Sequence, residues 1–224
     1  MQVEICCNSV FSAHNAKLGG AYRIELCQAL EEGGTTPSAA AIEHCVHVLN
    51  LHTRVLIRPR GGDFCYSPEE TAIIMRDIEI AHKLGAHAVV VGFLTPDGTI
   101  DMDKTREAVK AAEGMSVTFH RAFDECKSPY DALEQIIDCG CNKLLTSGCR
   151  PTAMEGVETL KKLVLLAGNR IGIIAASGIT YENVTKIIES TGVEEIHASC
   201  KTYQNGTTYS DAGQVRKLFE RITN

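Results

Sequence analysis

The sequence predicts an α/β protein, a (β/α)₈ TIM barrel that forms a single domain over residues 1–224. Three observations support this prediction. Eight β-branched, apolar strand patterns alternate with helical patterns along the chain, without an antiparallel hairpin signal. No composition break or low-complexity linker divides the 224 residues, a common length for one barrel. No Gly-x-Gly-x-x-Gly motif follows the first strand pattern, which disfavours an open dinucleotide-binding sheet.

Each predicted strand is followed by a predicted helix. The strands are expected at residues 2–7, 22–27, 53–58, 87–92, 115–120, 142–146, 170–176 and 193–199. The helices are expected at about 9–19, 37–50, 67–85, 103–113, 129–139, 154–168, 181–191 and 211–222. Two helices begin with a serine N-cap followed by proline, at Ser67 and Ser128. Others end at a glycine, namely at Gly85, Gly140 and Gly192.

Composition narrows the function classes. A formal net charge of −6 gives no reason to expect nucleic acid or an anionic membrane surface as a partner. No stretch reaches the roughly 18 apolar residues of a membrane-spanning helix. Residues 1–5 resemble a strand and not a signal peptide. The ten cysteines lie in a long chain of periodic elements, which favours reduced thiols. We therefore expect a cytoplasmic protein.

Strand alternation predicts which side chains point into the barrel. In the first strand Val3 and Ile5 face the helices, which leaves Glu4 and Cys6 pointing inward. The same rule sends a polar set inward from four other strands: Arg23, Glu25 and Cys27; Arg58; Thr118 and His120; Glu195, His197 and Ser199. Barrels are usually filled with Val, Ile and Leu, so this polar interior indicates a functional pocket. The alternative is an ion-pair network that only fixes strand register.

An anion site is expected where the third strand ends. The strand leads into Arg58 and Arg60, which are followed by paired glycines and Asp63. Guanidinium groups at this junction indicate that carboxylates or an anionic ligand meet them. Short turns after the sixth and seventh strands offer backbone N–H groups that can hold an anion. The predicted anion-binding residues are Arg58, Arg60, Ser147, Gly148, Ser177 and Gly178.

Two thiols predict a metal site. Cys6 and Cys27 occupy matching positions on neighbouring strands, each two residues after a glutamate, and adjacent strands lie about 4.8 Å apart. Paired thiolates in a reducing compartment suit Cu(I) at low coordination number. The alternative is that both are small buried apolar residues.

A histidine at the end of the fifth strand predicts proton transfer. His120 is a candidate general acid or base with Glu25 as its partner, and it can equally be a hydrogen-bonding core residue. The remaining polar residues assigned to the pocket are Glu4, Arg23, Asp63, Asp124 and His197.

Six motifs together resemble the CutC copper homeostasis family, from residue 3 to beyond residue 200. They are Glu4-Ile-Cys6, Gly20-Ala-Tyr-Arg-Ile-Glu-Leu-Cys27, Glu32-Gly-Gly-Thr-Thr-Pro-Ser38, Ile57-Arg-Pro-Arg-Gly-Gly-Asp-Phe64, Thr118-Phe-His-Arg-Ala-Phe-Asp124 and Leu145-Thr-Ser-Gly148. The resemblance implies a (β/α)₈ barrel, a cytoplasmic location, a homodimer and a role in handling copper, with Cys6 and Cys27 at the positions of the cysteines proposed as Cu(I) ligands in the family. The segment 201–210 is shorter than in many relatives, which implies a reduced lid or oligomer contact.

Two functional hypotheses follow. The first is a Cu(I)-binding barrel that uses Cys6 and Cys27. The second is an enzyme that acts on a small anionic metabolite, such as a phosphorylated one, by acid–base chemistry with Glu25 and His120.

Overall fold

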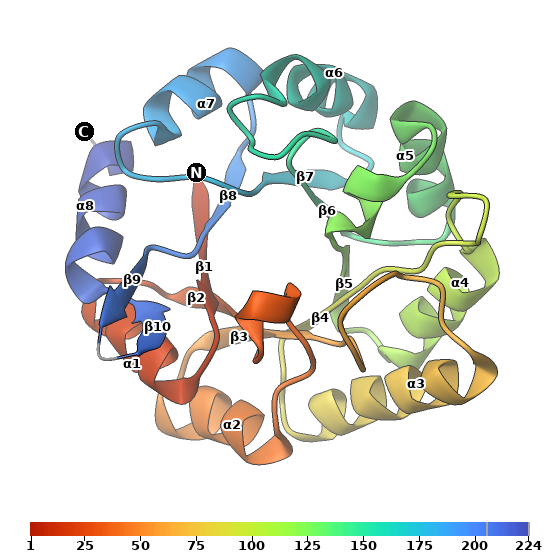
Figure 1. The fold of residues 1–224 in the computed structure, drawn as a ribbon, viewed down its shortest axis with the longest axis horizontal. Helices are drawn as coiled ribbons and strands as arrows, with labels where there is room; N and C mark the ends of the chain where they lie inside the picture. Colours follow the sequence, from red (N-terminus) through yellow and green to blue (C-terminus); the bar gives the residue numbers. More distant parts are fainter. Residues whose placement is uncertain (205, 224) are drawn as a thin grey trace.

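The computed structural model describes residues 1–204 and 206–223 and confirms the predicted (β/α)₈ barrel (Figure 1). Over these residues eight parallel strands close in chain order: β1 (Gln2–Cys7), β2 (Arg23–Leu26), β3 (His52–Leu56), β4 (Ala88–Val91), β5 (Ser116–Phe119), β6 (Lys143–Thr146), β7 (Gly172–Ala175) and β8 (Glu195–Ala198). The surrounding helices are α1 (Val10–Leu18), α2 (Ala39–Glu43), α3 (Pro68–Lys83), α4 (Met102–Ala111), α5 (Pro129–Asp138), α6 (Val157–Ala167), α7 (Val184–Thr191) and α8 (Ala212–Thr223). Every strand lies at least in large part within its predicted range.

The apolar core lies mainly between the strands and the helices. Ile5, Ile24 and Val55 belong to this layer and are fully buried. Inside the barrel, the described residues form two much smaller apolar clusters: Cys6, Cys27, Leu56 and Val90 in one, and Leu145, Ile174 and Ala176 in the other. The rest of the interior is strongly charged, as the strand alternation predicts.

Parallel register decides which polar side chains become neighbours. Glu4 of β1 pairs with Arg23 of β2 on one side and with His197 of β8 on the other. Two residues further along β1, Cys6 pairs with Glu25 of β2. Residues two apart on a strand share a face, so Glu4, Cys6 and their three register partners all lie toward the barrel axis.

The carboxylate of Glu4 is the centre of a buried ion-pair network. It lies 3.3 Å from the guanidinium nitrogens of both Arg23 and Arg54, and 2.9 Å from Nδ1 of His197. Arg23 also forms an ion pair with Glu195 at 2.8 Å. The Glu4 side chain is only 1% exposed, so its charge depends on these partners and not on water.

Two helix starts show how local sequence sets element boundaries. Ser67 caps α3 as predicted: its hydroxyl accepts the Glu70 N–H, and the Glu70 carboxylate accepts the Ser67 N–H in return. Ser128 precedes α5 as predicted, but its hydroxyl donates to the Asp131 carboxylate and does not cap the helix.

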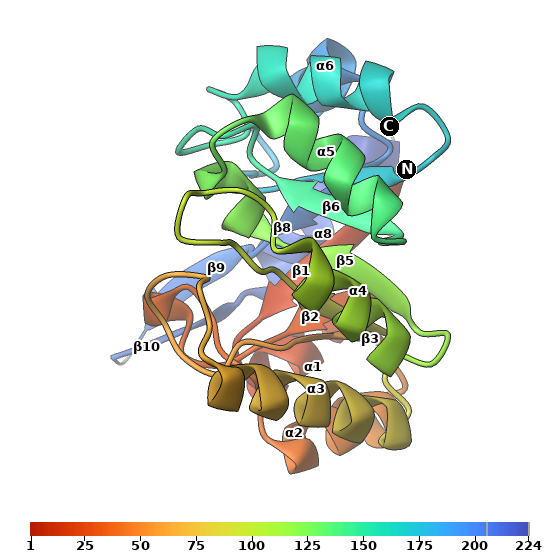
Figure 2. The same ribbon diagram turned by 90° about the vertical axis from the view of Figure 1, so that its right-hand side faces the viewer.

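One prediction about the topology was wrong. After β8 the chain forms an antiparallel hairpin, β9 (Lys201–Gln204) and β10 (Thr207–Ser210), which projects at the end of the barrel opposite the amino terminus (Figure 2). The sequence does contain a hairpin signal, an Asn-Gly dipeptide between polar and aromatic residues of high β-propensity.

β3 ends earlier than predicted, at Leu56, so Arg58 lies in the loop that follows. Within residues 1–204 and 206–223, no helix combines the length and apolar character needed to cross a membrane.

We predict that Glu4→Gln lowers the free energy of unfolding by about 3–5 kcal/mol, because it leaves the buried Arg54 guanidinium without a carboxylate and removes one of the two carboxylate partners of Arg23. Urea unfolding measures this loss. Glu134→Gln is the matched control, since Glu134 forms an exposed ion pair with Arg170 and its loss is expected to leave the unfolding midpoint unchanged. Equal effects of the two substitutions would show that the buried network contributes no more than a surface pair.

Candidate functional site

A cavity of about 1200 Å³ opens at the carboxyl ends of the barrel strands. Its walls come from the loops that follow β2, β3, β5, β6, β7 and β8, and it reaches down to side chains of the strands themselves. Loops at this end of a barrel carry the functional residues in TIM-barrel proteins, so the cavity is the candidate site.

The floor of the cavity carries the two thiols. Cys6 and Cys27 both line it, are 7% and 1% exposed, and pack with Leu56. The neighbouring Cys27 thiol together with burial raises the pKa of Cys6 well above its ordinary value. The structure therefore brings together the two residues predicted as Cu(I) ligands.

A carboxylate and an imidazole lie beside the thiol of Cys6. The Cys6 sulfur, a Glu25 oxygen and a His197 ring nitrogen all lie within 4.8 Å of one another. Glu25 is buried, and its Oε2 has no hydrogen-bond partner within residues 1–204 and 206–223. A buried carboxylate oxygen without a protein partner favours a bound cation or a bound proton at this position.

The protonation of His197 is controlled by its neighbours. Burial by itself lowers the pKa of His197, but the Glu25 charge and hydrogen bonds with Cys6 and Glu4 outweigh burial, so the net pKa lies well above the ordinary value. For Glu4, burial and neighbouring charges also act in opposite directions, and the net pKa lies below the ordinary value. Burial raises its pKa, yet the His197 hydrogen bond and the Arg54 and Arg23 charges lower it to about 2. The floor thus pairs an ionised carboxylate with a readily protonated imidazole.

Glu25 has a pKa suited to proton transfer near neutral pH. Burial is the largest influence and raises the pKa of Glu25 to about 7, although the His197 charge acts against it. A carboxyl with a pKa near 7 can both accept and donate a proton at physiological pH.

His120 presents one unused donor. Its Nδ1 accepts the backbone N–H of Ala122 at 3.1 Å, so in the neutral ring the proton lies on Nε2. That Nε2 is buried and has no partner in the described part of the chain. Burial, and then the Arg58 charge, lower the pKa of His120 to about 3, which keeps the ring neutral. Gly92 leaves room for the ring, because a Cβ there would lie 2.3 Å from it.

Arg58 holds the loop that covers the thiols. Its guanidinium donates to the carbonyls of Glu32, Gly34 and Gly62 at 2.9, 3.1 and 2.6 Å. Gly33 has a φ of +84°, and a side chain there would press on the same guanidinium. The loop includes the short helix η1 (Leu30–Glu32), seen in orange inside the ring of strands in Figure 1. Its Leu30 packs on the Cys6 and Cys27 cluster.

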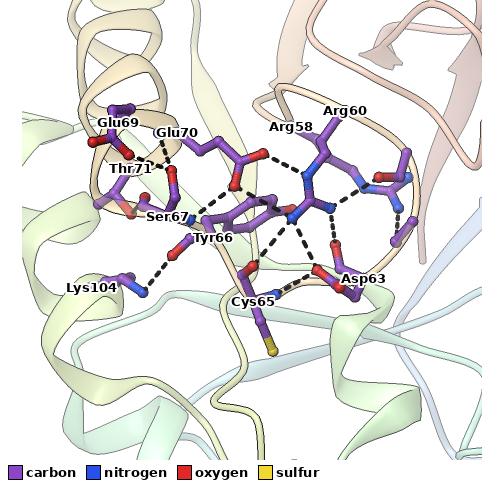
Figure 3. Close-up of polar contacts among 12 residues, drawn as sticks. Arg58, Arg60, Asp63, Cys65, Tyr66, Ser67, Glu69, Glu70, Thr71 and Lys104 are labelled. Carbon is purple, nitrogen blue, oxygen red and sulfur yellow. Dashed lines mark hydrogen bonds and ion pairs between the residues drawn. The ribbon is translucent and has the colours of Figure 1, made fainter.

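Arg60 lies outside the cavity. Figure 3 shows its guanidinium between the carboxylates of Glu70 and Asp63, at 2.5 and 3.0 Å. It also donates to the Cys65 carbonyl at 3.2 Å. Arg60 therefore braces the loop between β3 and α3, and Asp63 is its partner and not a cavity residue.

Asp124 supplies an internal anion at the turn after β6. Its carboxylate accepts the backbone N–H groups of Ser147 and Cys149 at 3.0 Å each, together with the Ser147 hydroxyl at 2.9 Å. The Gly148 N–H donates to the Thr146 hydroxyl at 2.9 Å. The donors predicted to hold an external anion at this turn thus have acceptors inside the protein.

The predicted site residues divide clearly by position. Those that line the cavity are Cys6, Glu25, Cys27, Arg58, His120, Asp124, Ser177, Gly178 and His197, whereas Glu4, Arg23, Arg60, Asp63, Ser147 and Gly148 do not. Arg54 was missed, although it shares the phase of Arg58 on the third strand pattern. Leu30 was also missed, and no local pattern marks it. The roles predicted for these residues stay predictions.

Comparison with known proteins identifies relatives over most of the chain. The family model of the CutC family matches residues 1–202. A CutC family protein of Bacteroides thetaiotaomicron is 49% identical over 201 residues, which cover 89% of this chain and 81% of the relative. The structure of a CutC protein from Streptococcus agalactiae, to which a role in copper homeostasis is attributed, is 32% identical. It has a TM-score of 0.85 and a coverage of 89% of this chain and 98% of its own. Thiamine phosphate pyrophosphorylase from Pyrococcus furiosus, at 16% identity and a TM-score of 0.65 over 99% and 95% of the two chains, shares the fold alone.

We predict that Glu25 makes stability fall between pH 4.5 and pH 7. The folded protein holds the Glu25 proton more tightly than the unfolded chain, because the pKa rises from 4.5 to about 7 on folding. This contribution is therefore complete below pH 4.5 and is lost as the pH rises through 7. Glu25→Gln keeps a neutral side chain, so its stability relative to wild type should increase from pH 5 to pH 8, by on the order of 2–3 kcal/mol. Urea unfolding at the two pH values tests this, and a constant difference would contradict it.

Proposed function

This chain belongs to the CutC family, and from this premise we propose that it serves copper homeostasis in the cytoplasm by binding Cu(I) through the thiolates of Cys6 and Cys27. The observation that supports the proposal is the cluster of Cys6, Glu25 and His197 donor atoms within 4.8 Å of one another, with Cys27 packed beside Cys6.

The chemistry of the donor set fits a soft ion. Thiolates are the preferred protein ligands of Cu(I), and an imidazole suits copper as well. Cys6 and Cys27 hold the ion in this proposal, and His197 becomes a third ligand from β8 only when it releases its ring proton. Glu25 offers its unpartnered oxygen to the ion or takes up a proton that a thiol releases on binding.

The surroundings favour a small, weakly coordinated ion over a hydrated one. Leu30, Leu56 and Val90 pack around the two sulfurs, so the floor provides few oxygen ligands. Hard ions such as Mg²⁺ keep several water ligands and demand oxygen donors. Cu(I) accepts low coordination by sulfur and does not need such ligands.

We predict that the double substitution Cys6→Ser with Cys27→Ser weakens Cu(I) binding by at least about 100-fold, because it removes both soft ligands while the fold remains. Competition with a chromogenic Cu(I) chelator under anaerobic conditions measures the affinity. The double substitution Cys139→Ser with Cys141→Ser is the control, since these cysteines lie near the opposite end of the barrel, between α5 and β6. If the Cys6/Cys27 variant competes for Cu(I) as well as wild type, this site is wrong.

A second candidate function is supported by the size of the cavity. At about 1200 Å³ it is far larger than an ion requires and somewhat exceeds the usual range of small-molecule sites, about 300 to 1,000 Å³, so a small metabolite fits inside it. Its lining contains both charges: the cations Arg58, Arg121, Arg150 and Lys201 can contact an anionic group of a ligand, beside the carboxyl groups of Glu25, Glu32, Asp124, Glu125 and Glu182. In this function Glu25 transfers protons and the neutral His120 donates a hydrogen bond from Nε2.

We predict that a small phosphorylated or carboxylate metabolite raises the thermal midpoint of wild type and that His120→Asn abolishes most of this shift. Asparagine places an acceptor where Nδ1 lies, so it can retain the Ala122 N–H bond while it removes the Nε2 donor. Arg58→Ala is a poorer probe, because Arg58 holds three loop carbonyls. A broad panel of such metabolites without any stabilising compound would argue against the enzyme.

A further inference from the structure

Cys126 and Cys149 form a second pair of neighbouring thiols, of which Cys149 lines the cavity. Cys126 directly follows the short helix η3 (Arg121–Glu125) after β5, and Cys149 lies three residues after β6. The Phe123 carbonyl accepts both the Cys126 N–H at 3.1 Å and the Cys149 thiol at 3.8 Å. The two thiols are also close enough for each to shift the pKa of the other. Neither residue takes part in the proposed functions.

The backbone keeps the pair together. Asp124, two residues before Cys126, accepts the Cys149 N–H at 3.0 Å and so ties the two loops to each other. Cys149 itself has a φ of +58°, a left-handed conformation that is uncommon for a residue with a side chain. Sulfur atoms placed next to each other by fixed loops can form a disulfide with little movement of the chain.

The two thiols differ in reactivity in the way that an attacking and a resolving cysteine differ. The neighbouring Cys126 thiol lowers the pKa of Cys149, although burial and the Asp124 charge act in the opposite direction. The neighbouring Cys149 thiol, and then burial, raise the pKa of Cys126. Both residues are half-buried, and Cys149 lines the cavity, so a small oxidant can reach it.

We propose that Cys126 and Cys149 form a reversible disulfide when a peroxide enters the cavity. The Cys149 thiolate attacks one peroxide oxygen and the O–O bond breaks, which leaves a sulfenic acid and a hydroxide that takes a proton to become water. The Cys126 sulfur then attacks the Cys149 sulfur, so the S–S bond forms and the S–O bond breaks. The Cys126 proton leaves with the departing hydroxide as a second water. In total, two thiols and one hydrogen peroxide become one disulfide and two waters.

The other neighbouring thiols are less suited to this reaction. Cys6 and Cys27 lie at the cavity floor, nearly fully buried, and the pKa of Cys6 is raised. Cys139 and Cys141 are buried as well, and burial raises the pKa of each. Peroxide is therefore expected to react with Cys149 first and to yield the Cys126–Cys149 disulfide. This cross-link would join the loops after β5 and β6 covalently.

Tryptic mapping tests this proposal on wild-type protein. The fully reduced chain is treated with one equivalent of hydrogen peroxide in the presence of a metal chelator, and free thiols are then alkylated. Trypsin releases Cys126 in the peptide 122–127 and Cys149 in the peptide 144–161, because the Arg150–Pro151 bond resists cleavage, and each peptide contains a single cysteine. We expect these two peptides to be recovered as one disulfide-linked species that a dithiol reductant separates.

Single substitutions test the order of the steps. Cys126→Ser should prevent the cross-link and leave a sulfenic acid at Cys149 that a dimedone-type reagent traps, whereas Cys149→Ser should show neither product. Cys141→Ser is the control and should form the cross-link at the wild-type rate. A first disulfide between any other cysteines, or no disulfide at all, would overturn the proposal, and the wild-type result does not depend on how the variants fold.

Discussion

The buried positive charges inside this barrel depend chiefly on one buried carboxylate, that of Glu4, for their neutralisation. It lies between two guanidiniums and an imidazole that arrive from three other strands, and water has almost no access to it. Buried charges of this kind are tolerated only when they are paired and hydrogen-bonded. Because the network orients His197, it also decides which way that ring presents its second nitrogen to Cys6 and Glu25. The strand register and the geometry of the cavity floor therefore depend on the same contacts.

Much of the fold and of the cavity floor follows from the sequence, because strands have a period of two. That period identifies Glu4, Cys6 and Glu25 as inward-facing without any knowledge of their partners. Arg58 and Arg60 show the limit of such reasoning. They are two residues apart with the same chemistry, yet one holds carbonyls of a distant loop and the other meets the carboxylate that caps α3. Their different roles depend on contacts that no local pattern contains.

The turn after β6 shows the same limit for backbone groups. Small residues there predict free N–H donors, and the structure supplies them with the Asp124 carboxylate from a loop 23 residues earlier. A sequence shows that such a turn attracts an anion, but it does not show whether the anion is a ligand or part of the chain. The cavity consequently has two chemically different levels. Sulfur, imidazole and carboxyl groups form its floor, while charged side chains of both signs from the loops surround its opening.

The position of Leu30 over the two sulfurs has a consequence for transport to the floor. An ion in water carries a hydration shell, and this apolar side chain offers no group that can replace it. In the proposed Cu(I) function, this favours an ion that has lost its hydration shell before it reaches the floor. A freely dissolved aquo ion would meet a dehydration barrier at this point, and such a barrier slows escape from the floor as much as entry to it.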